Sequence, residues 1–234
     1  RRYAGPKVDA LADAGLSGFV LKKDSPSCGM ERVKVYDHNG APSQSDSGVF
    51  AKLLMTALPL LPVEEEGRLS DPRIRENWIE RVLAYAALKE LLSSKPRAGD
   101  FVKFHTRHKM TLLAHSPEHY KKLGALVAAG KKYTAKEFAS RYEALFMDAM
   151  KKIASPGRHT NVLQHMAGYL KTHLDAESKK ELDSVIQDYR KSLVPLIVPV
   201  TLLAHYVRLY KVSYLQGQSY LSPHPKELAL RSHV

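Results

Sequence analysis

A single cysteine stands in a turn-rich loop and is the residue best suited to nucleophilic or soft-metal chemistry. The loop reads Ser25-Pro26-Ser27-Cys28-Gly29 and follows the apolar run Phe19–Leu21, which we expect to be a buried strand. Open α/β sheets bind ligands beyond the carboxyl ends of their strands, where this loop would lie. A thiolate there can attack an electrophile or bind a metal, and the Ser25 hydroxyl can donate a hydrogen bond to whatever the sulfur holds.

The same cysteine also has a plainer interpretation. Single cysteines are commonly buried and inert, and a loop of Ser, Pro and Gly can serve only to turn the chain. From the local sequence alone we favour this structural interpretation. With one cysteine in 234 residues, the chain can form neither an intramolecular disulfide nor a zinc site built from several thiolates.

A second set of candidates lies further along the chain, where basic, histidine and tyrosine side chains are interleaved. Residues 81–234 carry a net charge of +13 and residues 1–80 a net charge of −1, so the later part holds all of the positive excess. Such a charge indicates a polyanionic partner, either nucleic acid or an anionic membrane surface. Lys and Arg can neutralise phosphates, while Tyr and His can stack on unpaired bases. The predicted RNA contacts are Lys103, His105, Arg107, His108, Lys109, His115, Tyr120, Lys121, Lys122, Lys131, Lys132, Arg158, His159 and Lys171.

Each of these side chains has an alternative role. A single lysine is more often part of a solvated helix face, so the RNA interpretation depends on the charge of the whole domain. Arg158 and His159 stand at an expected helix start, where free backbone N–H groups can meet a phosphate. His105 and His108 share a helical face, but no carboxylate or cysteine lies at ligand spacing from them, so we do not expect a metal site.

Two further groups are predicted to be structural. Tyr206, Leu209 and Tyr210, near His205, follow an apolar run and are expected in the core. The acidic run Glu64–Glu66 is either an exposed turn or a partner for Arg68 and arginines of the next helix, and we favour the structural role.

The elements that must position these residues change character near residue 71. Before it the pattern is mixed α/β; after it, N-cap residues such as Asp71, Ser116 and Thr134 open a nearly continuous series of helices. We expect strands at 19–21 and 33–35 and helices at 7–14, 48–58, 71–92, 101–114, 116–129, 134–154, 160–173, 176–193 and 199–212.

No segment predicts a membrane anchor. The longest uncharged stretch, Ser192–Val207, contains Pro195 and Pro199 and is shorter than the roughly 18 apolar residues of a membrane span. We expect it to be a buried helix pair. The chain starts without Met or an apolar signal region, and we expect it to begin inside a domain of a longer protein.

Several motifs in one order resemble two known families. The early motifs resemble the C-terminal half of the TudS-like thiouracil desulfidase domain, and the later ones resemble the YbgA-like domain. The fusion is similar to bacterial RudS-type thiouridine desulfidases that act on tRNA. The early motifs are Gly18–Lys22, Ser25–Gly29, Lys34–Asp37, Gly48–Ala51 and Pro62–Leu69; the later ones are Phe104-His105, Lys109, Leu112–Pro117, Tyr120, Leu123-Gly124 and Ser222–Leu228.

This resemblance implies a fold, a cofactor and a partner. The fold would be mainly α, with a truncated Rossmann-like α/β portion (1–70), a connecting helix and linker (71–100) and an all-α domain (101–234) that binds tRNA. The cofactor would be a [4Fe–4S] cluster held by three cysteines, with Cys28 as one ligand and Ser25 beside the substrate, a thiolated uridine of tRNA. The resemblance further implies a cytoplasmic protein that removes the sulfur of 4-thiouridine as hydrosulfide.

The sequence departs from this family in one respect. The other two cluster cysteines and a catalytic glutamate of the family belong to the N-terminal half of that domain, which residues 1–234 do not include. We therefore expect this piece alone to lack the cluster and to be inactive. The alternative function is a non-catalytic helical module that binds RNA or another protein.

Overall fold

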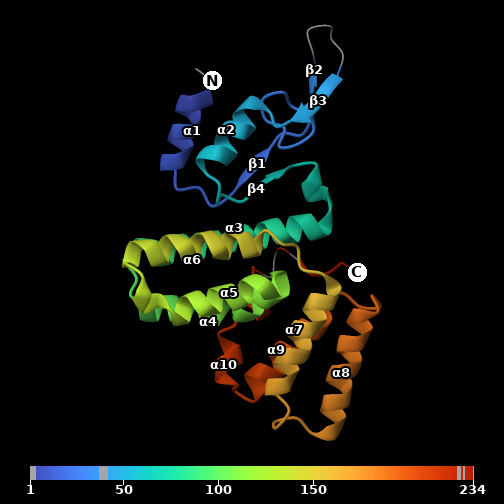
Figure 1. The fold of residues 1–234 in the computed structure, drawn as a ribbon. Helices are drawn as coiled ribbons and strands as arrows, with labels where there is room; N and C mark the ends of the chain where they lie inside the picture. The colour runs from blue at the N-terminus through green and yellow to red at the C-terminus, as the bar shows by residue number, and fades with distance from the viewer. Residues whose placement is uncertain (1–3, 37–41, 226–227, 229, 234) are drawn as a thin grey trace. The chain divides into compact units, whose positions relative to one another are not determined.

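The computed structural model describes residues 4–36, 42–225, 228 and 230–233, and it contains two compact units, Arg1–Ala86 and Ala87–Val234 (Figure 1). Each unit is described by itself. The chain is mainly helical, which confirms the coarse fold class predicted from the sequence. Asp37 of the third early motif, and Lys226 and Glu227 of the last motif, lie outside the described residues.

The N-terminal unit combines short strands with three helices. Its parallel pair joins two strands far apart in the sequence, with Phe19 opposite Val63. A second, antiparallel pair joins the two remaining strands. The elements are α1 (Ala4–Asp13), β1 (Phe19–Leu21), β2 (Val33–Tyr36), β3 (Pro42–Asp46), α2 (Val49–Ala57), β4 (Val63–Glu65), the 3-10 turn η1 (Arg68–Ser70) and α3 (Pro72–Ser93), which continues past the unit's boundary.

A small apolar core holds these elements together. Leu21 of β1, Ala51 and Leu54 of α2 and Val8 of α1 are all buried in it. The indole N–H of Trp78 donates to the Pro62 carbonyl over 3.1 Å and so fastens α3 to the start of β4. The core therefore fixes β1 and α2, the two elements on either side of the Cys28 loop.

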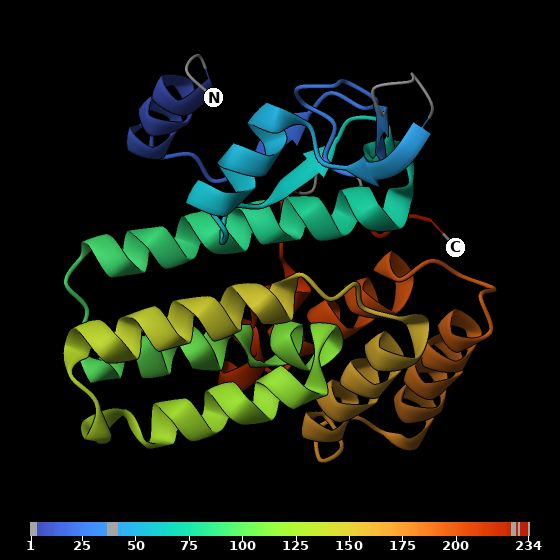
Figure 2. The same cartoon turned by 45° about the horizontal axis from the view of Figure 1, so that its top comes forward.

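The described part of the C-terminal unit is helical. Its longer helices form two groups, α4 with α5 and α6, and α7 with α8 and α9. Figure 2 shows α4, α5 and α6 side by side, and α7 and α8 packed together. α4 also contacts α7 and the 3-10 turn η3, and so joins the two groups. The elements are α4 (Ala98–His115), α5 (Pro117–Ala128), η2 (Gly130–Lys132), α6 (Ala135–Met150), α7 (Pro156–Tyr169), α8 (Ala176–Arg190), α9 (Ile197–Leu209), α10 (Ser213–Gln216) and η3 (Ser219–Leu221).

Most helix starts carry the caps that the sequence indicates. The Ser116 hydroxyl accepts the His119 N–H, and that of Thr134 accepts the Glu137 N–H. Several boundaries differ from the expectation by a few residues, and the largest difference at a helix start is in α7, which begins at Pro156 rather than at residue 160. Ser155 caps this helix by accepting the Arg158 N–H. Pro156 stands at the first helical position, where proline is favoured although it breaks the interior of a helix.

Aromatic rings fill the interface between α4 and α6. Phe101 packs edge-on against Phe138 at a centroid distance of 4.8 Å, and Phe104 lies 5.2 Å from Phe146. Tyr142, fully buried, contacts both Phe101 and Phe104. This cluster fixes which face of α4 points inward.

Two histidines belong to the same buried face. His108 stacks on Phe104, and its Nδ1 lies 2.9 Å from the Phe104 carbonyl. His105 Nδ1 lies 3.4 Å from the Tyr142 hydroxyl, while its Nε2 has no hydrogen-bond partner among the described residues. Burial lowers the pKa of both histidines to about 4, so both are neutral near pH 7.

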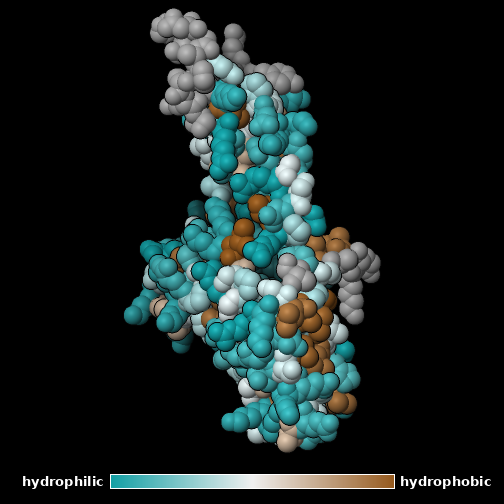
Figure 3. Space-filling view, turned by 90° about the vertical axis from the view of Figure 1, so that its right-hand side faces the viewer, coloured by the Kyte–Doolittle hydropathy of each residue, from teal (hydrophilic) through white to brown (hydrophobic). Residues whose placement is uncertain are grey.

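The uncharged stretch 192–207 forms one helix instead of the expected pair. α9 begins at Ile197, and Pro199 fits within its first turn, where a missing N–H costs no intrahelical bond. Within the described ranges, no helix is both long and apolar enough to cross a bilayer. Figure 3 shows a mostly hydrophilic surface on the face drawn, with hydrophobic residues gathered at one side of its lower part.

The buried histidines predict how stability depends on pH. Their pKa is about 6.5 in the unfolded chain and about 4 in the folded one, so between these values the unfolded chain binds protons that the folded chain does not. The free energy of unfolding should therefore have its full value above pH 6.5. It should fall as the pH approaches 4, by up to about 3 kcal/mol per histidine. Denaturant unfolding at several pH values measures this.

His105→Phe should flatten that dependence, because the ring stays while the titratable nitrogen is removed. The exposed His173, changed to Phe, serves as the control and should leave the slope unchanged. An identical pH slope for His105→Phe and the unaltered chain would contradict this account of α4.

Candidate functional site

The Cys28 loop is fastened to the start of α2 by main-chain hydrogen bonds. The carbonyl of Ser27 accepts the N–H groups of Phe50 (2.8 Å) and Ala51 (3.1 Å), and that of Pro26 accepts the Val49 N–H (3.3 Å). These are N–H groups that a helix start leaves without intrahelical partners. Gly48 is required at this contact, since a Cβ there would come within 2.8 Å of the Cys28 nitrogen and closer still to the Ser27 carbonyl.

Two serine hydroxyls surround the cysteine. The Ser27 hydroxyl lies 3.3 Å from Cys28 Sγ, and the Ser25 hydroxyl accepts the Cys28 N–H over 3.2 Å. The two hydroxyl oxygens are 3.1 Å apart. Ser25, predicted to stand beside the substrate, thus holds the loop backbone, while Ser27, which the sequence marks only as a turn residue, contacts the sulfur.

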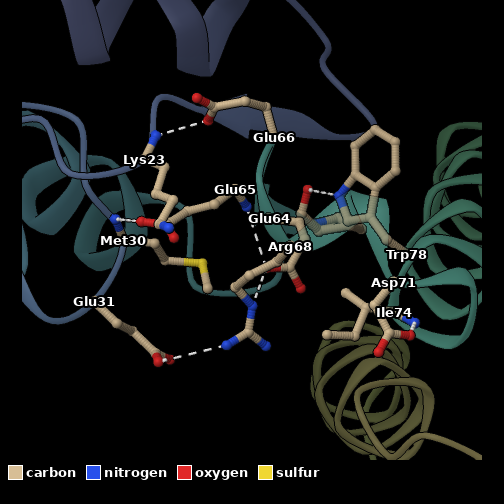
Figure 4. A network of polar contacts seen from close by, with 11 residues as sticks. Lys23, Met30, Glu31, Glu64, Glu65, Glu66, Arg68, Asp71, Ile74 and Trp78 are labelled. Carbon is tan, nitrogen blue, oxygen red and sulfur yellow. Dashed lines mark hydrogen bonds and ion pairs between the residues drawn. The ribbon is translucent and has the colours of Figure 1, made fainter.

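Glutamates of the acidic run clamp both ends of this loop, as Figure 4 shows. The Glu65 carboxylate accepts the Met30 N–H over 2.6 Å, after the loop, and Glu66 accepts the Lys23 N–H over 2.7 Å, before it. A hydrogen bond between a carboxylate and a backbone N–H is worth about 1.5–3 kcal/mol when buried, as Glu65 is. Sequence reasoning missed this role, because it depends on the pairing of β1 with β4.

The third glutamate has the partner that the sequence proposed for it. Glu64 is buried and lies 2.7 Å from Arg68 Nε, and Arg68 also lies 3.7 Å from the exposed Glu31. Lys22 at 3.0 Å and the Lys23 N–H hold the pKa of Glu66 below its usual range, so this end of the clamp stays ionised.

Left-handed backbone marks both limits of the clamped segment. Asp24 has φ 55° and Arg32 has φ 60°. Asp tolerates this region, whereas an arginine there costs of order 1 kcal/mol or more and persists only where surrounding contacts hold it. The same conformation occurs at Lys95, Ser192 and Lys211, so it describes the tight path of the chain here and does not by itself indicate function.

Cys28 opens onto an apolar cavity of about 520 Å³ within the N-terminal unit. Residues of α1, the loop and the start of α2 line it, and the half-buried thiol stands in its wall with Ser27. Lys7 is the charged residue among these lining side chains. A cavity of this size and character suits a flat, largely uncharged ligand. The lining residues are Ala4, Lys7, Ala10, Leu11, Ser27, Cys28, Val49 and Phe50.

The donors of this chain do not suffice for an iron–sulfur cluster. A [4Fe–4S] cluster is held by cysteine thiolates, and the sequence contains one cysteine. In the part of the chain that the structure describes, no three His, Cys, Asp or Glu side chains are grouped so that they could hold a metal ion. Cys28 fits the role of one ligand, and the set as a whole is incomplete.

In the C-terminal unit, burial divides the predicted RNA contacts. The rings of His105, His108, His115 and His159 are at most 9% exposed. Stacking on a base needs an exposed ring face, so we assign these four histidines to packing. His115 Nδ1 lies 2.6 Å from the Lys152 carbonyl, and His159 Nδ1 lies 2.9 Å from the Tyr220 hydroxyl.

The basic candidates lie on the surface. Lys109 and Tyr120 are partly buried, and two of the exposed lysines pair with neighbouring acids: Lys122 with Glu118 at 2.6 Å and Lys103 with Asp100 at 3.9 Å. Arg158 donates to the His115 carbonyl over 2.9 Å and thereby joins the start of α7 to the end of α4. The exposed candidates are Lys103, Arg107, Lys121, Lys122, Lys131, Lys132, Arg158 and Lys171.

A serine–histidine–aspartate array stands at the start of α5. His119 Nδ1 lies 2.8 Å from the Ser116 hydroxyl, and its Nε2 lies 2.8 Å from Asp148 of α6. Ser116 is also the N-cap of α5, and its side chain is buried. The array therefore fastens α5 to α6.

Both units match known families. A family model described as 2-thiouracil desulfurase matches residues 1–66, and one described as "Protein of unknown function (DUF1722)" matches residues 109–225. The first match indicates a desulfurase enzyme and includes Cys28, its serines and the glutamate clamp. The two resemblances expected from the sequence motifs are confirmed.

A relative supports the second match. The chain is 31% identical over 160 residues to "Uncharacterized protein YbgA" of Escherichia coli (strain K12), an alignment that covers 68% of this chain and 95% of the relative. No solved structure matches the chain.

The glutamate clamp makes a testable prediction. Glu65→Ala should free the Met30 N–H and expose the loop, so that Cys28 reacts at least several-fold faster with a thiol reagent under native conditions. Glu31→Ala, an exposed neighbour that does not bond the loop, is the matched control and should react as the unaltered chain does. Equal rates in all three proteins would show that the clamp does not control the cysteine.

Proposed function

Since the chain belongs to the family described as "Protein of unknown function (DUF1722)" and carries a desulfurase-like unit, we propose that it is part of a tRNA 4-thiouridine desulfurase. In this reaction water replaces the sulfur of the thiocarbonyl group, so that the products are uridine and hydrosulfide. The observation that carries the proposal is the thiol of Cys28 in the wall of an apolar cavity. A thiolated pyrimidine has a flat, uncharged ring that suits the apolar cavity, and a soft sulfur that suits a site beside the thiol.

We assign the loop residues to positioning. Ser27 donates its hydroxyl hydrogen to the sulfur of Cys28 when that sulfur is ionised, and Ser25 holds the Cys28 N–H so that the sulfur keeps its direction. The glutamate clamp and the start of α2 prevent the loop from relaxing around a ligand. These residues provide a fixed thiolate in an apolar environment.

The cofactor proposal requires thiolates beyond residues 1–234. We propose that Cys28 is one of three cysteine ligands of a [4Fe–4S] cluster, with the others supplied from outside this sequence. The chemistry such a cluster supplies is an open iron position with affinity for sulfur. We also propose that β1 and β4 belong to a larger Rossmann-like sheet, because parallel strands occur almost only in larger sheets covered on both faces.

The helical unit is proposed to bind the tRNA. The net charge of +13 on residues 81–234 favours a polyanion. His105 and His108 stay neutral in the core, so the positive charge of this unit lies on its lysines and arginines; most of those described are exposed, whereas Arg231 is buried. Phosphate contacts by these side chains would hold the tRNA without reading its sequence.

A second candidate function is a helical module without chemistry. It is favoured by the E. coli relative, nearly all of which aligns with 160 residues of this chain, so a protein with little beyond that segment exists. In this case RNA binding or a protein contact would be the whole function of the unit.

The tRNA proposal predicts binding that depends strongly on salt. The chain should bind tRNA with micromolar or tighter affinity at low salt, because each neutralised phosphate releases counterions. Replacing Lys121 and Lys122 together by Ala should weaken binding and flatten the plot of log affinity against log salt by roughly one unit per lost contact. A mobility-shift titration with a duplex DNA control measures this; no binding at low salt would favour the protein-contact alternative.

The desulfurase proposal is tested at Cys28. In a gene product that supplies the remaining thiolates, Cys28→Ala should abolish both the iron–sulfur absorbance after anaerobic reconstitution and the loss of 4-thiouridine from tRNA. Ser27→Ala should keep the iron and slow turnover about tenfold or more, because it removes a hydrogen bond and not a ligand. Full activity of Cys28→Ala would overturn the assignment.

A further inference from the structure

Aromatic rings form a stacked ladder between α7 and the α9–α10 segment. On each side the rings follow one another at intervals of four residues along the sequence. Tyr169 ends α7 and His173 lies in the turn after it, while Tyr206 belongs to α9, Tyr210 caps its end and Tyr214 belongs to α10. Tyr169 stacks on Tyr214 with centroids 5.0 Å apart and an interplanar angle of 24°, and His173 stacks on Tyr210 at 5.7 Å and 28°. The members are His165, Tyr169, His173, Tyr206, Tyr210 and Tyr214.

One side of this ladder reaches the surface. Tyr169 is 39% exposed, and His165, which packs edge-on against it at 5.6 Å, is exposed as well. The other side is anchored, because Tyr210 and Tyr214 pack against the core of α7, α8 and α9. Burial, with a contribution from Tyr169, raises the pKa of Tyr214 to about 12, so this ring is an uncharged phenol near pH 7. Rings held in this way lose little freedom when a flat ligand stacks on them.

A groove of about 300 Å³ lies on the adjacent face of α7, against α8. Its floor is apolar, since Leu174, Leu182 and Ile186 belong to the buried core. Its rim is polar, with Gln164 and Lys171 on one side and Lys179 and Asp183 on the other. An apolar floor under a polar rim is the composition expected of a site for a small, partly charged ligand.

Gly168 lines this groove. It lies near the end of α7, where glycine costs up to about 1 kcal/mol relative to alanine. A Cβ built there meets no atom within 4 Å, and its backbone has no left-handed conformation. An alanine therefore fits at this position, whereas a larger side chain would occupy the groove.

The rim offers groups for both parts of a nucleotide. Lys171 is exposed and forms no ion pair with any residue in the described ranges, so its ammonium group is available to a phosphate. The Gln164 amide provides a donor and an acceptor, the combination that matches a base edge. Asp183, whose carboxylate is 3.5 Å from the Gln187 amide, can accept from a ribose hydroxyl or an exocyclic amino group.

We propose that the exposed face of α7 binds unpaired nucleotides of RNA, with one base stacked on Tyr169 and the neighbouring nucleotide seated in the groove beside Gly168. Lys171 and Lys179 then contact the phosphates. This inference rests on the proposed tRNA function and names the contact surface. It assigns base stacking to α7 instead of the buried histidines of α4.

Charge favours RNA over a protein partner at this surface. Tyrosine-rich patches also occur in protein interfaces, but here the patch belongs to a segment of net charge +13 and lies beside two exposed lysines. Stacked rings with flanking lysines are the arrangement by which proteins bind single-stranded nucleic acid.

The test is a fluorescence anisotropy titration of the whole chain with a short uridine-rich single-stranded RNA and with duplex RNA. Tyr169→Ala should weaken binding of the single strand about tenfold or more and change duplex binding by less than twofold, since a duplex offers no free base face. Gly168→Leu should weaken the single strand similarly by filling the groove. Lys171→Ala with Lys179→Ala should flatten the salt dependence by about two units.

Three matched controls keep the test specific. Tyr169→Phe retains the ring and should bind as the unaltered chain does. Gly168→Ala should fold normally, because its methyl group meets open space, and Lys180→Ala removes a neighbouring exposed lysine that does not line the groove. Thermal unfolding of each variant checks that the fold is intact.

The outcomes separate this inference from the proposed function. If the chain binds RNA but Tyr169→Ala and Gly168→Leu bind the single strand unchanged, the α7 surface is wrong and the tRNA function stands. If the unaltered chain binds neither the single-stranded nor the duplex RNA, both the α7 surface and the proposed tRNA function are wrong. If Tyr169→Ala leaves RNA binding intact and abolishes self-association in light scattering, the ladder is a protein interface and the inference is overturned.

Discussion

The hydrogen bonds between the Ser27 and Pro26 carbonyls and the first N–H groups of α2 are the constraint on which the N-terminal unit depends. They give partners to N–H groups that would otherwise have none, and they direct the Cys28 loop across the helix start. Glycine at position 48 is the steric condition for this contact. The glutamates of β4 then hold the two ends of the loop, and the thiol is left facing an apolar cavity.

In the C-terminal unit, α4 places neutral histidines in the core and charged side chains on the surface. Aromatic rings between α4 and α6 enclose His105 and His108, and burial keeps both neutral near pH 7. The charged side chains of the same helices, such as Lys103 and Arg107, are exposed. A helix rich in His, Lys and Arg thus supplies a core face and a basic face, and the two do not share residues.

Local signals in the sequence predicted much of the fold. β1 has the expected bounds, and the caps at Ser116 and Thr134 open the helices that they predict, because each signal acts within a few residues. The start of α7 was expected at residue 160, but the helix begins at Pro156, because Ser155 caps it and proline fits its first position.

Long-range contacts were beyond the reach of the sequence. Glu65 and Glu66 were expected to have a structural role as partners of arginines. They instead accept backbone N–H groups at the ends of the Cys28 loop, and these bonds require β4 to pair with β1 more than 40 residues away. Of the residues expected in the core, Tyr206 is buried, but Leu209 is 57% exposed because it ends α9 on the outer face. Tyr210 is half-buried in a ladder that exists only when α7 packs beside α9. The loop was predicted to be a candidate site from its cysteine and from the family resemblance. The direct contact of the Ser27 hydroxyl with the Cys28 sulfur depends on how the loop folds and was not predicted.

We propose that a thiolated base enters the Cys28 cavity while the helical unit holds the tRNA. 4-Thiouridine forms covalent crosslinks to neighbouring side chains under near-ultraviolet light, so tRNA carrying it can report where the base lies without any cofactor. Irradiation of the complex and mass spectrometry of the peptides should give crosslinks to residues that line the cavity, Phe50 and Leu11 among them. Crosslinks confined to the helical unit, at an affinity where tRNA is fully bound, would contradict the account.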